Sequence, residues 1–555
     1  MPGAQREESW MRLRFVTGAL LLALLGAVSA CTRVAGGGEG PSHNPWTVPG
    51  TLRVAISSAP NTLNTLLGTQ QIEVMVLGFA MDPLIATDPE GHDHPILAAT
   101  VPTLENGGIS RDGLTITYHL RHGVKWQDGA PFSSHDVQFT FRAIMNPDTL
   151  VGTRHGYDEI ARVETPDAYT AVFRLKRRFA PAVHTFFAHS DSVYYILPAH
   201  LLEKYHDLNR IPFNSLPVGT GPFKVLRWLR GDRIEYVAND NYFLGKPKLR
   251  RVVIRIVPDE NTIVDEMRAH EVDWFSQASP RVYPQIKLIP GYSIRLVPTN
   301  ANDAIIFNTA HPPFDDARVR RAVGLAIDKP VISRDVTYGT TIPAGEDLPD
   351  FMWASNPQAG WRTRDLPRAK ALLEAAGWHV GPGGIRVKNG KPLDAGLAFR
   401  TDSITDRNRG VLIASMLRDA GFNISLKGYT TALLYGPPGS GILADGKYDA
   451  ALETWYAGID PDNSTQMLCD QFPPHGLNWA RYCNPKMDAA QHDALDNYDR
   501  ARRKADYATI ESLLATDAPF VYLWWPRQIE AVNTDLQNFR PNGLVENWNA
   551  WTWSI

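Results

Sequence analysis

The order of apolar and polar residues predicts helices and strands that mix throughout the chain. Apolar residues alternate with polar ones at 114–120 and 169–175, which is typical of strands with one buried face. An apolar run at 252–257 predicts a third strand. Three other segments repeat apolar residues with the period of a helix, and they lie at 133–145, 315–327 and 367–377.

Capping residues and prolines set the expected ends of two of these helices. Ser133 or Ser134 can cap the first helix, and Pro147 ends it, because the residue before a proline avoids helical backbone angles. Pro367 suits the first turn of the last helix and Gly377 suits its end. Apolar positions on these helices are expected to be core.

The N-terminus predicts export and lipid attachment. Arg12 and Arg14 precede a short apolar run at 18–27, which is too short to span a membrane comfortably. The run ends in small residues followed by Cys31, a pattern that resembles the lipobox of bacterial lipoproteins. We therefore expect a signal peptide at 1–30 and a lipid on Cys31; an ordinary secretion signal is the alternative. Met11 is the expected start.

Composition predicts an ordinary globular protein after this leader. The chain has 555 residues, enough for several domains, and 44% of them are hydrophobic. Its 56 Lys and Arg against 59 Asp and Glu give a net charge of −3, which argues against a dedicated nucleic-acid binder. Residues 31–49 are rich in Gly, Ser and Pro and predict a flexible, lipidated tether. Outside the cytoplasm, Cys469 and Cys483 are expected to form a disulfide.

Motifs for catalysis and metal binding are weak. The Gly-rich stretch at 436–441 lacks the Lys of a phosphate-binding loop. His92, Asp93 and His94 could hold a metal, but such residues on a turn are more often simply solvated. Asp460 and Asp462 could serve a secreted hydrolase as an acid and base pair. We expect no cofactor and no enzymatic activity.

A series of motifs along the mature chain resembles the family 5 extracellular solute-binding proteins, which are receptors of ABC importers for peptides, oligopeptides and nickel. The first motif is LRHGVKWQDGAPFSSHDVQFTF at 120–141. In chain order, further motifs occupy 196–201, 217–223, 241–247, 257–262, 307–328, 369–378 and 448–463. No single motif is specific, but their ordered succession is. Their Gly and Pro residues mark turns, so the motifs indicate fold more than ligand contact.

The resemblance implies an α/β fold of the type II, cluster C periplasmic-binding-protein kind, with two hinged lobes and an extra subdomain. By order along the chain, lobe I should comprise 50–90, 213–300 and 530–555. The extra subdomain should comprise 91–212, and lobe III should comprise 301–529. The hinge is expected near Val297–Asn302 and near Ala531–Thr534, and closure would bury the ligand.

The resemblance also indicates where a ligand would lie. In peptide-binding relatives an Asp three places after a Trp pairs with the peptide ammonium, but Gly458 occupies that place after Trp455. Asp460 or another acid could compensate, because an unpaired buried ammonium is costly. Alternatively, the ligand lacks a free amine. The expected ligand-binding residues are Asn61, Leu63, Asn64, Trp455, Tyr456, Ala457, Gly458 and Asp460.

The predicted function is that of a lipid-anchored, monomeric binding protein in the cell envelope. It would bind a small solute, with an oligopeptide leading, and deliver it to ABC permease subunits. The alternatives are the secreted hydrolase, a receptor of the same fold for an oligosaccharide, nickel chelate or haem, and a sensor or adhesin without transport. The membrane is expected to be contacted through the lipid alone.

Overall fold

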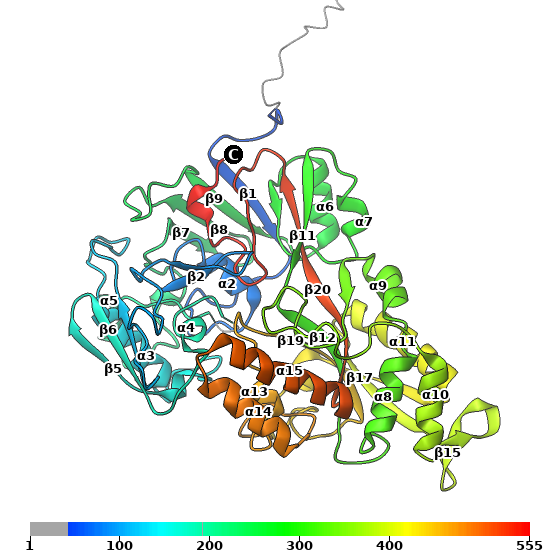
Figure 1. Ribbon diagram of the computed structural model, residues 1–555. Coiled ribbons are helices and arrows are strands. Elements are labelled where there is room, and N and C mark those ends of the chain that lie inside the picture. Colours follow the sequence, from blue (N-terminus) through cyan, green and yellow to red (C-terminus); the bar gives the residue numbers. More distant parts are fainter. Residues whose placement is uncertain (1–42, 191–192) are drawn as a thin grey trace, which may run out of the picture. The chain divides into compact units, whose positions relative to one another are not determined.

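A large mixed sheet organises the computed structural model, which describes residues 43–190 and 193–555 (Figure 1). Within Trp46–Ile555, which is one compact unit, six strands form what we call the first half-sheet. They are β1 (Thr51–Ile56), β7 (Phe223–Leu229), β8 (Arg233–Ala238), β9 (Arg251–Ile256), β10 (Trp274–Phe275) and β11 (Tyr292–Pro298). The first strand pairs in parallel with both β9 and β10.

Five further strands form the second half-sheet. They are β12 (Ala301–Phe307), β13 (Thr341–Pro343), β17 (Asp394–Arg400), β18 (Asn423–Tyr429) and β19 (Ala450–Tyr456). In β12 every residue is buried, and alternate residues enter different cores. Ile305 and Phe307 enter one core while Ala304 and Ile306 enter another, so both faces of this half-sheet are covered, as the apolar run at 304–307 requires.

One long strand, β20 (Phe520–Asn533), belongs to both half-sheets. Its residues Phe520–Trp524 pair with β12, whereas Arg527–Asn533 pair with β11. The chain also passes between the halves at Thr299 and Asn300, which separate β11 from β12. The first passage lies within the expected Val297–Asn302. The second passage lies around Pro526, inside β20 and before the residues Ala531–Thr534 near which a hinge is expected.

The chain between β1 and β7, the first two strands of the large sheet in chain order, forms a smaller layer. The strands β4 (Thr115–His119), β6 (Thr170–Leu175) and β5 (Ile160–Asp167) make a three-stranded sheet beside helix α3 (Ser134–Met145). A hairpin, β2 (Ile85–Thr87) with β3 (Asp93–Pro95), precedes them. Buried residues of this layer, such as Phe173, belong to the same core as Val54 of β1. The smaller sheet and the first half-sheet therefore share one core.

Helices pack on one face of the first half-sheet and on both faces of the second (Figure 1). The first half-sheet packs α6 (Glu260–Arg268) and α7 (Tyr283–Ile286) on one face. The second half-sheet carries α8, α9, α10 and α11 in one core and α14 and α15 in the other. Their bounds are Ala317–Ala326, Lys329–Thr337, Leu366–Ala375, Ile404–Ala420, Pro485–Asp496 and Arg500–Asp517. No helix in the described part of the chain is both long enough and apolar enough to cross a membrane.

The helices and strands predicted from the sequence are present. Ser133 is the N-cap of α3, and the helix ends at Met145, two residues before Pro147. Pro367 lies in the first turn of α10, and Gly377 follows it with a φ of +85°, a conformation that suits glycine. The disulfide between Cys469 and Cys483 is confirmed. Cys31 lies outside the described residues.

Candidate functional site

The predicted ligand loop after β19 lies at the junction of the half-sheets. The backbone amide of Ala457 donates to the Asn300 carbonyl at 3.2 Å, and the Asn300 side chain donates to the Gly458 carbonyl at 2.6 Å. Because Asn300 belongs to the passage between β11 and β12, the loop is fixed to the point where the chain crosses. A solute held by this loop would contact both half-sheets.

The aromatic residues of this loop are accessible to different extents. Trp455 is partly buried, whereas 50% of Tyr456 is exposed. Burial around the hydroxyl raises the pKa of Tyr456, and the negative charges of Asp303 and Glu546 add to that effect. Half of Tyr456 is therefore accessible, and its aromatic ring ends in a polar hydroxyl. An aromatic face with a polar end suits a solute that has both apolar and polar parts.

The carboxylate of Asp460 is fully engaged inside the protein. Its two oxygens accept hydrogen bonds from Arg503 of α15 at 2.6 and 2.7 Å, and both side chains are buried. The Arg503 guanidinium also lies 5.3 Å from the Trp353 ring centroid. Breaking a buried, bidentate carboxylate–arginine pair would cost more than a hydrogen bond to a ligand ammonium would return. Asp460 therefore does not replace the ligand-binding carboxylate that peptide-binding relatives have at the position of Gly458.

The loop after β1 contributes less accessible surface than its residue types suggest. Leu63 is 1% exposed and Asn64 is 0% exposed. The Asn64 side chain donates to Asn214 at 2.9 Å and accepts from the Leu66 amide, so it organises the turn. Asn61 is exposed and lines an open groove with Arg230, which donates to its carbonyl. Of these three residues, only Asn61 has an exposed side chain in this conformation.

A group of polar side chains that the sequence did not single out lies at the end of β10. Gln277 follows this strand and has a φ of +56°, which is rare for a residue with a side chain. Its side chain donates to Glu546 at 2.6 Å, and its backbone amide donates to Glu530. Gln528 of β20 also donates to Glu546, at 2.9 Å. Burial raises the pKa of both glutamates. Only spatial proximity unites these residues, so no sequence spacing could have revealed the group.

Comparison with known proteins identifies the family. Residues 83–474 match the bacterial extracellular solute-binding proteins, family 5 middle. This chain belongs to that family. Protein XP55 of Streptomyces lividans is 28% identical over 473 residues, covering 85% of this chain and 82% of XP55. The oligopeptide-binding protein AppA of Bacillus subtilis is 25% identical over 529 residues and covers 91% of each chain.

Solved structures show the same fold. NikZ from Campylobacter jejuni, in complex with Ni(L-His), superposes with a TM-score of 0.77 at 24% identity, covering 92% of this chain and 100% of NikZ. This family 5 protein therefore has the expected α/β fold of the type II periplasmic-binding-protein kind. Its family consists of solute-binding proteins and not of enzymes, so the comparisons support a binding function and not the hydrolase alternative.

The contacts of Asp462 agree with a binding role. Its carboxylate lies 3.1 Å from His155 and accepts from the Ser464 amide at 2.9 Å. These partners hold the pKa of Asp462 at about 2 despite burial. Asp462 therefore lacks the raised pKa of a general acid, and the Asp460 carboxylate is held by Arg503. His155 lies in the 91–212 segment. Its contact with Asp462 therefore links that segment to the loop after β19 of the second half-sheet.

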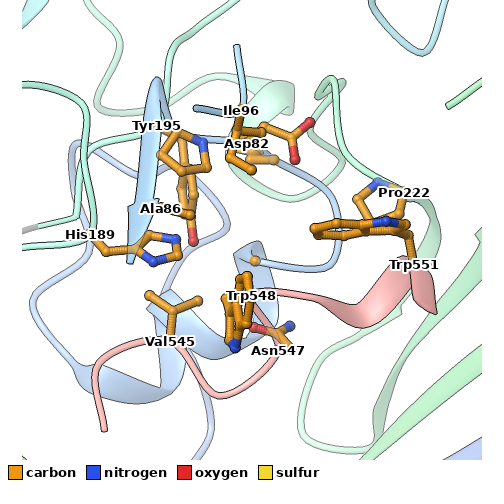
Figure 2. Close-up of a pocket in the computed structure, with 13 residues that line it drawn as sticks. Asp82, Ala86, Ile96, His189, Tyr195, Pro222, Val545, Asn547, Trp548 and Trp551 are labelled. Carbon is orange, nitrogen blue, oxygen red and sulfur yellow. The ribbon is translucent and has the colours of Figure 1, made fainter. Parts of the chain in front are cut away.

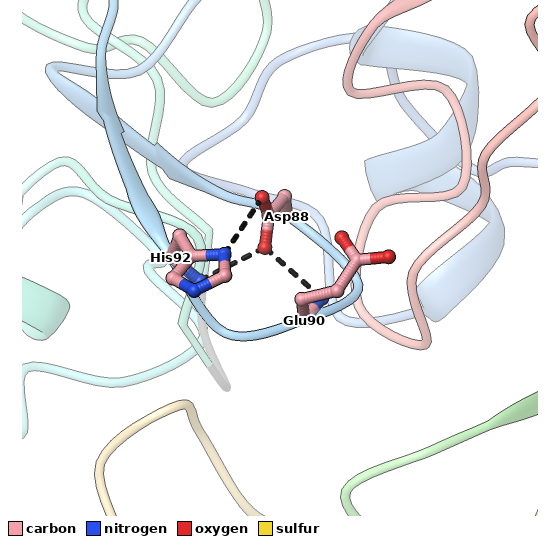
Figure 3. A group of neighbouring side chains, drawn as sticks. All are labelled: Asp88, Glu90 and His92. Carbon is pink, nitrogen blue, oxygen red and sulfur yellow. Dashed lines mark hydrogen bonds and ion pairs between the residues drawn. The ribbon is translucent and has the colours of Figure 1, made fainter.

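Two other groups of polar residues do not form a solute site. In Figure 2, Asp82, His189 and Tyr195 surround a cavity of about 10 Å³, which has room for one water and no solute. Figure 3 shows Asp88, Glu90 and His92 on the turn between β2 and β3. Asp88 accepts from the backbone amides of Glu90 and His92, so the group forms a hydrogen-bonded turn.

Proposed function

We propose that this protein captures a peptide between its two lobes and delivers it to the permease of an ABC importer. The observation that carries the proposal is the attachment of the Ala457–Gly458 loop to Asn300 at the passage between the half-sheets. A ligand at this loop would touch both lobes and favour the closed arrangement through its differential affinity. The similarity to an oligopeptide-binding protein over 91% of each chain supports a peptide as the solute.

The proposed site keeps the residues expected from the sequence but gives them different tasks. Asn61, Trp455 and Tyr456 would contact the solute directly, while the backbone of Ala457 and Gly458 would border it. Leu63, Asn64 and Asp460 would hold the walls in place. The proposed lobes keep the ranges 50–90 with 213–300 and 530–555 for lobe I, 91–212 for the subdomain and 301–529 for lobe III, although β20 changes partner around Pro526.

The proposal includes a lipid anchor at Cys31 after removal of 1–30, a tether at 31–49 and a monomer in the cell envelope. The test of anchoring is metabolic labelling with a fatty acid in a bacterial host. The wild-type chain should be labelled and a Cys31→Ser variant should not. Equal labelling of both would exclude this anchor.

Binding is tested with purified full-length protein and three probe sets: peptides of two to nine residues, oligosaccharides, and nickel–histidine. Peptides should raise the melting temperature and reduce the radius of gyration in small-angle scattering, and mass spectrometry should recover them unchanged. Tyr456→Ala should weaken peptide binding, whereas Tyr205→Ala, at a residue that is 37% exposed elsewhere, should not. Stabilisation by oligosaccharides or nickel–histidine alone, or recovery of cleaved peptide, would refute the proposal.

A further inference from the structure

Two buried carboxyl groups at the junction of the half-sheets have only neutral partners. Glu530 lies on β20 and accepts from the Trp274 indole at 2.6 Å and from the Gln277 amide. Glu546 accepts from the side chains of Gln277 and Gln528 on a single oxygen, Oε1. Both glutamates are fully buried, and the described contacts give neither of them an arginine, lysine or histidine.

Several buried acids of the chain have the cation that is missing here, although Asp82, Glu453 and Glu511 do not. Asp460 has Arg503, Asp303 has Arg409 at 2.7 Å, and Glu235 has three arginines. The second oxygen of Glu546, Oε2, is buried and has no hydrogen-bond partner among the described residues. The side-chain oxygen of the neighbouring Gln528 is in the same condition. Two unfilled acceptors beside a buried carboxyl can receive a donor that carries positive charge, provided that a ligand can reach them.

The position of Glu546 connects this group to the proposed solute site. Gly543, three residues earlier, lies so close to the passage that an added Cβ would fall 2.3 Å from the Pro298 carbonyl oxygen. Gln277, which holds Glu546, stands at the carboxyl end of β10, a strand parallel to β1. The carboxyl ends of parallel strands are where α/β sheets bind ligands.

We propose that Glu546, held by Gln277 and Gln528, receives a positively charged group of the bound solute and replaces the carboxylate that Gly458 lacks. This inference rests on the proposed peptide-binding function and specifies its chemistry. The charged group is an ammonium or guanidinium, from either the peptide N-terminus or a basic side chain. The carboxylate that binds the solute's cation would therefore lie across the junction from the loop after β19, and not on that loop.

Two matched peptide pairs distinguish the sources of charge. The first pair is trialanine and N-acetyl-trialanine; the second is N-acetyl-Ala-Lys-Ala and its norleucine counterpart. In calorimetry on the full-length protein, Glu546→Gln should weaken the charged member of the responsive pair by about 10-fold or more and the neutral member by less than about twofold. The pair that responds identifies the source. The control is Glu511→Gln on α15, a buried glutamate whose oxygens also lack partners, and it should change neither pair.

A measurement without ligand keeps the inference testable if peptides fail to bind. A carboxylate that waits for a ligand cation destabilises the empty protein, so Glu546→Gln should raise the melting temperature at pH 8 by about 2 °C or more. A purely structural Glu546 would give a lower melting temperature. The inference is overturned by that lower temperature, or by equal weakening of both members of every pair. If no peptide binds but the melting temperature of Glu546→Gln is raised, the proposed peptide-binding function is refuted and the inferred cation site at Glu546 is retained.

Discussion

The buried ion pair between Asp460 and Arg503 makes a quantitative prediction about stability. Replacing Arg503 by methionine keeps the volume but leaves the Asp460 carboxylate buried without a cation. Removing one partner of a buried pair costs about 3–5 kcal/mol, and this pair is bidentate at 2.6 and 2.7 Å with both side chains below 10% exposed. We expect the free energy of unfolding of Arg503→Met to fall by that amount.

The double variant separates the pair from its surroundings. Asp460→Leu with Arg503→Met exchanges the ion pair for apolar contact with Trp353, and such exchanges are often close to neutral. The double variant should therefore be within about 1 kcal/mol of the wild type, and the cycle with Asp460→Leu alone should give a coupling energy of about 2 kcal/mol or more.

Urea unfolding of the full chain at pH 7 provides the assay, with circular dichroism and tryptophan fluorescence recorded together. Coincident transitions justify a two-state free energy. The reasoning is refuted if Arg503→Met costs less than about 1 kcal/mol, or if the two single costs simply add. Either result would mean that Asp460 is solvated and free to meet a ligand, contrary to the contacts of its loop.

Three more predictions follow from described contacts. Burial raises the pKa of Asp82 from 3.8 to about 7, so the neutral acid favours folding; this contribution is complete below pH 3.8, is lost as pH rises through about 7 and amounts to about 4 kcal/mol. The Asp82→Asn variant should lack this part of the pH slope in urea titrations from pH 4 to 8, and an unchanged slope would contradict it. Changing both Cys469 and Cys483 to alanine should cost about 3 kcal/mol, since their bond closes a loop with a separation of 14 residues, whereas no loss in the same titration would show that the loop is ordered without it. Gly458→Asp should change calorimetric binding of trialanine by less than about twofold, because the solute's cation is expected at Glu546 across the junction, and a gain of about 10-fold for trialanine but not for its acetylated form would place the N-terminus at the Gly458 loop instead.

Local chemistry explains which parts of the fold were predictable. The ends of α3 depend on Ser133 and Pro147, which act on their immediate neighbours, and the pattern of α8 repeats within ten residues. The exchange of partners by β20 around Pro526 was not predicted, because nothing in the composition of the strand marks it, and the hinge expected near Ala531–Thr534 stays a prediction. Pairing is a property of two segments, and sequence patterns describe one segment at a time.

The candidate site was less predictable because its residue types have alternative uses. Asp460 looked like a free acid near the ligand loop, but its partner Arg503 is 43 positions further along the chain. Asn64 looked like a ligand donor, and it instead bonds Asn214, 150 positions away. Glu546 and Gln277 are 269 positions apart and meet only after both half-sheets have formed. Long-range pairing of this kind leaves no local signature.

The continuity of β20 has a mechanical consequence for closure. Because its backbone runs through both half-sheets without an intervening loop, the proposed lobes would stay joined at this point and would rotate about it. Pro526, where the pairing changes, carries no amide hydrogen, so the shared strand has one fewer ladder bond to distort there. Opening of the proposed lobes would then twist the hydrogen-bonded backbone of β20. In the empty protein this twist would fall on the strand that carries Gln528 and Glu530.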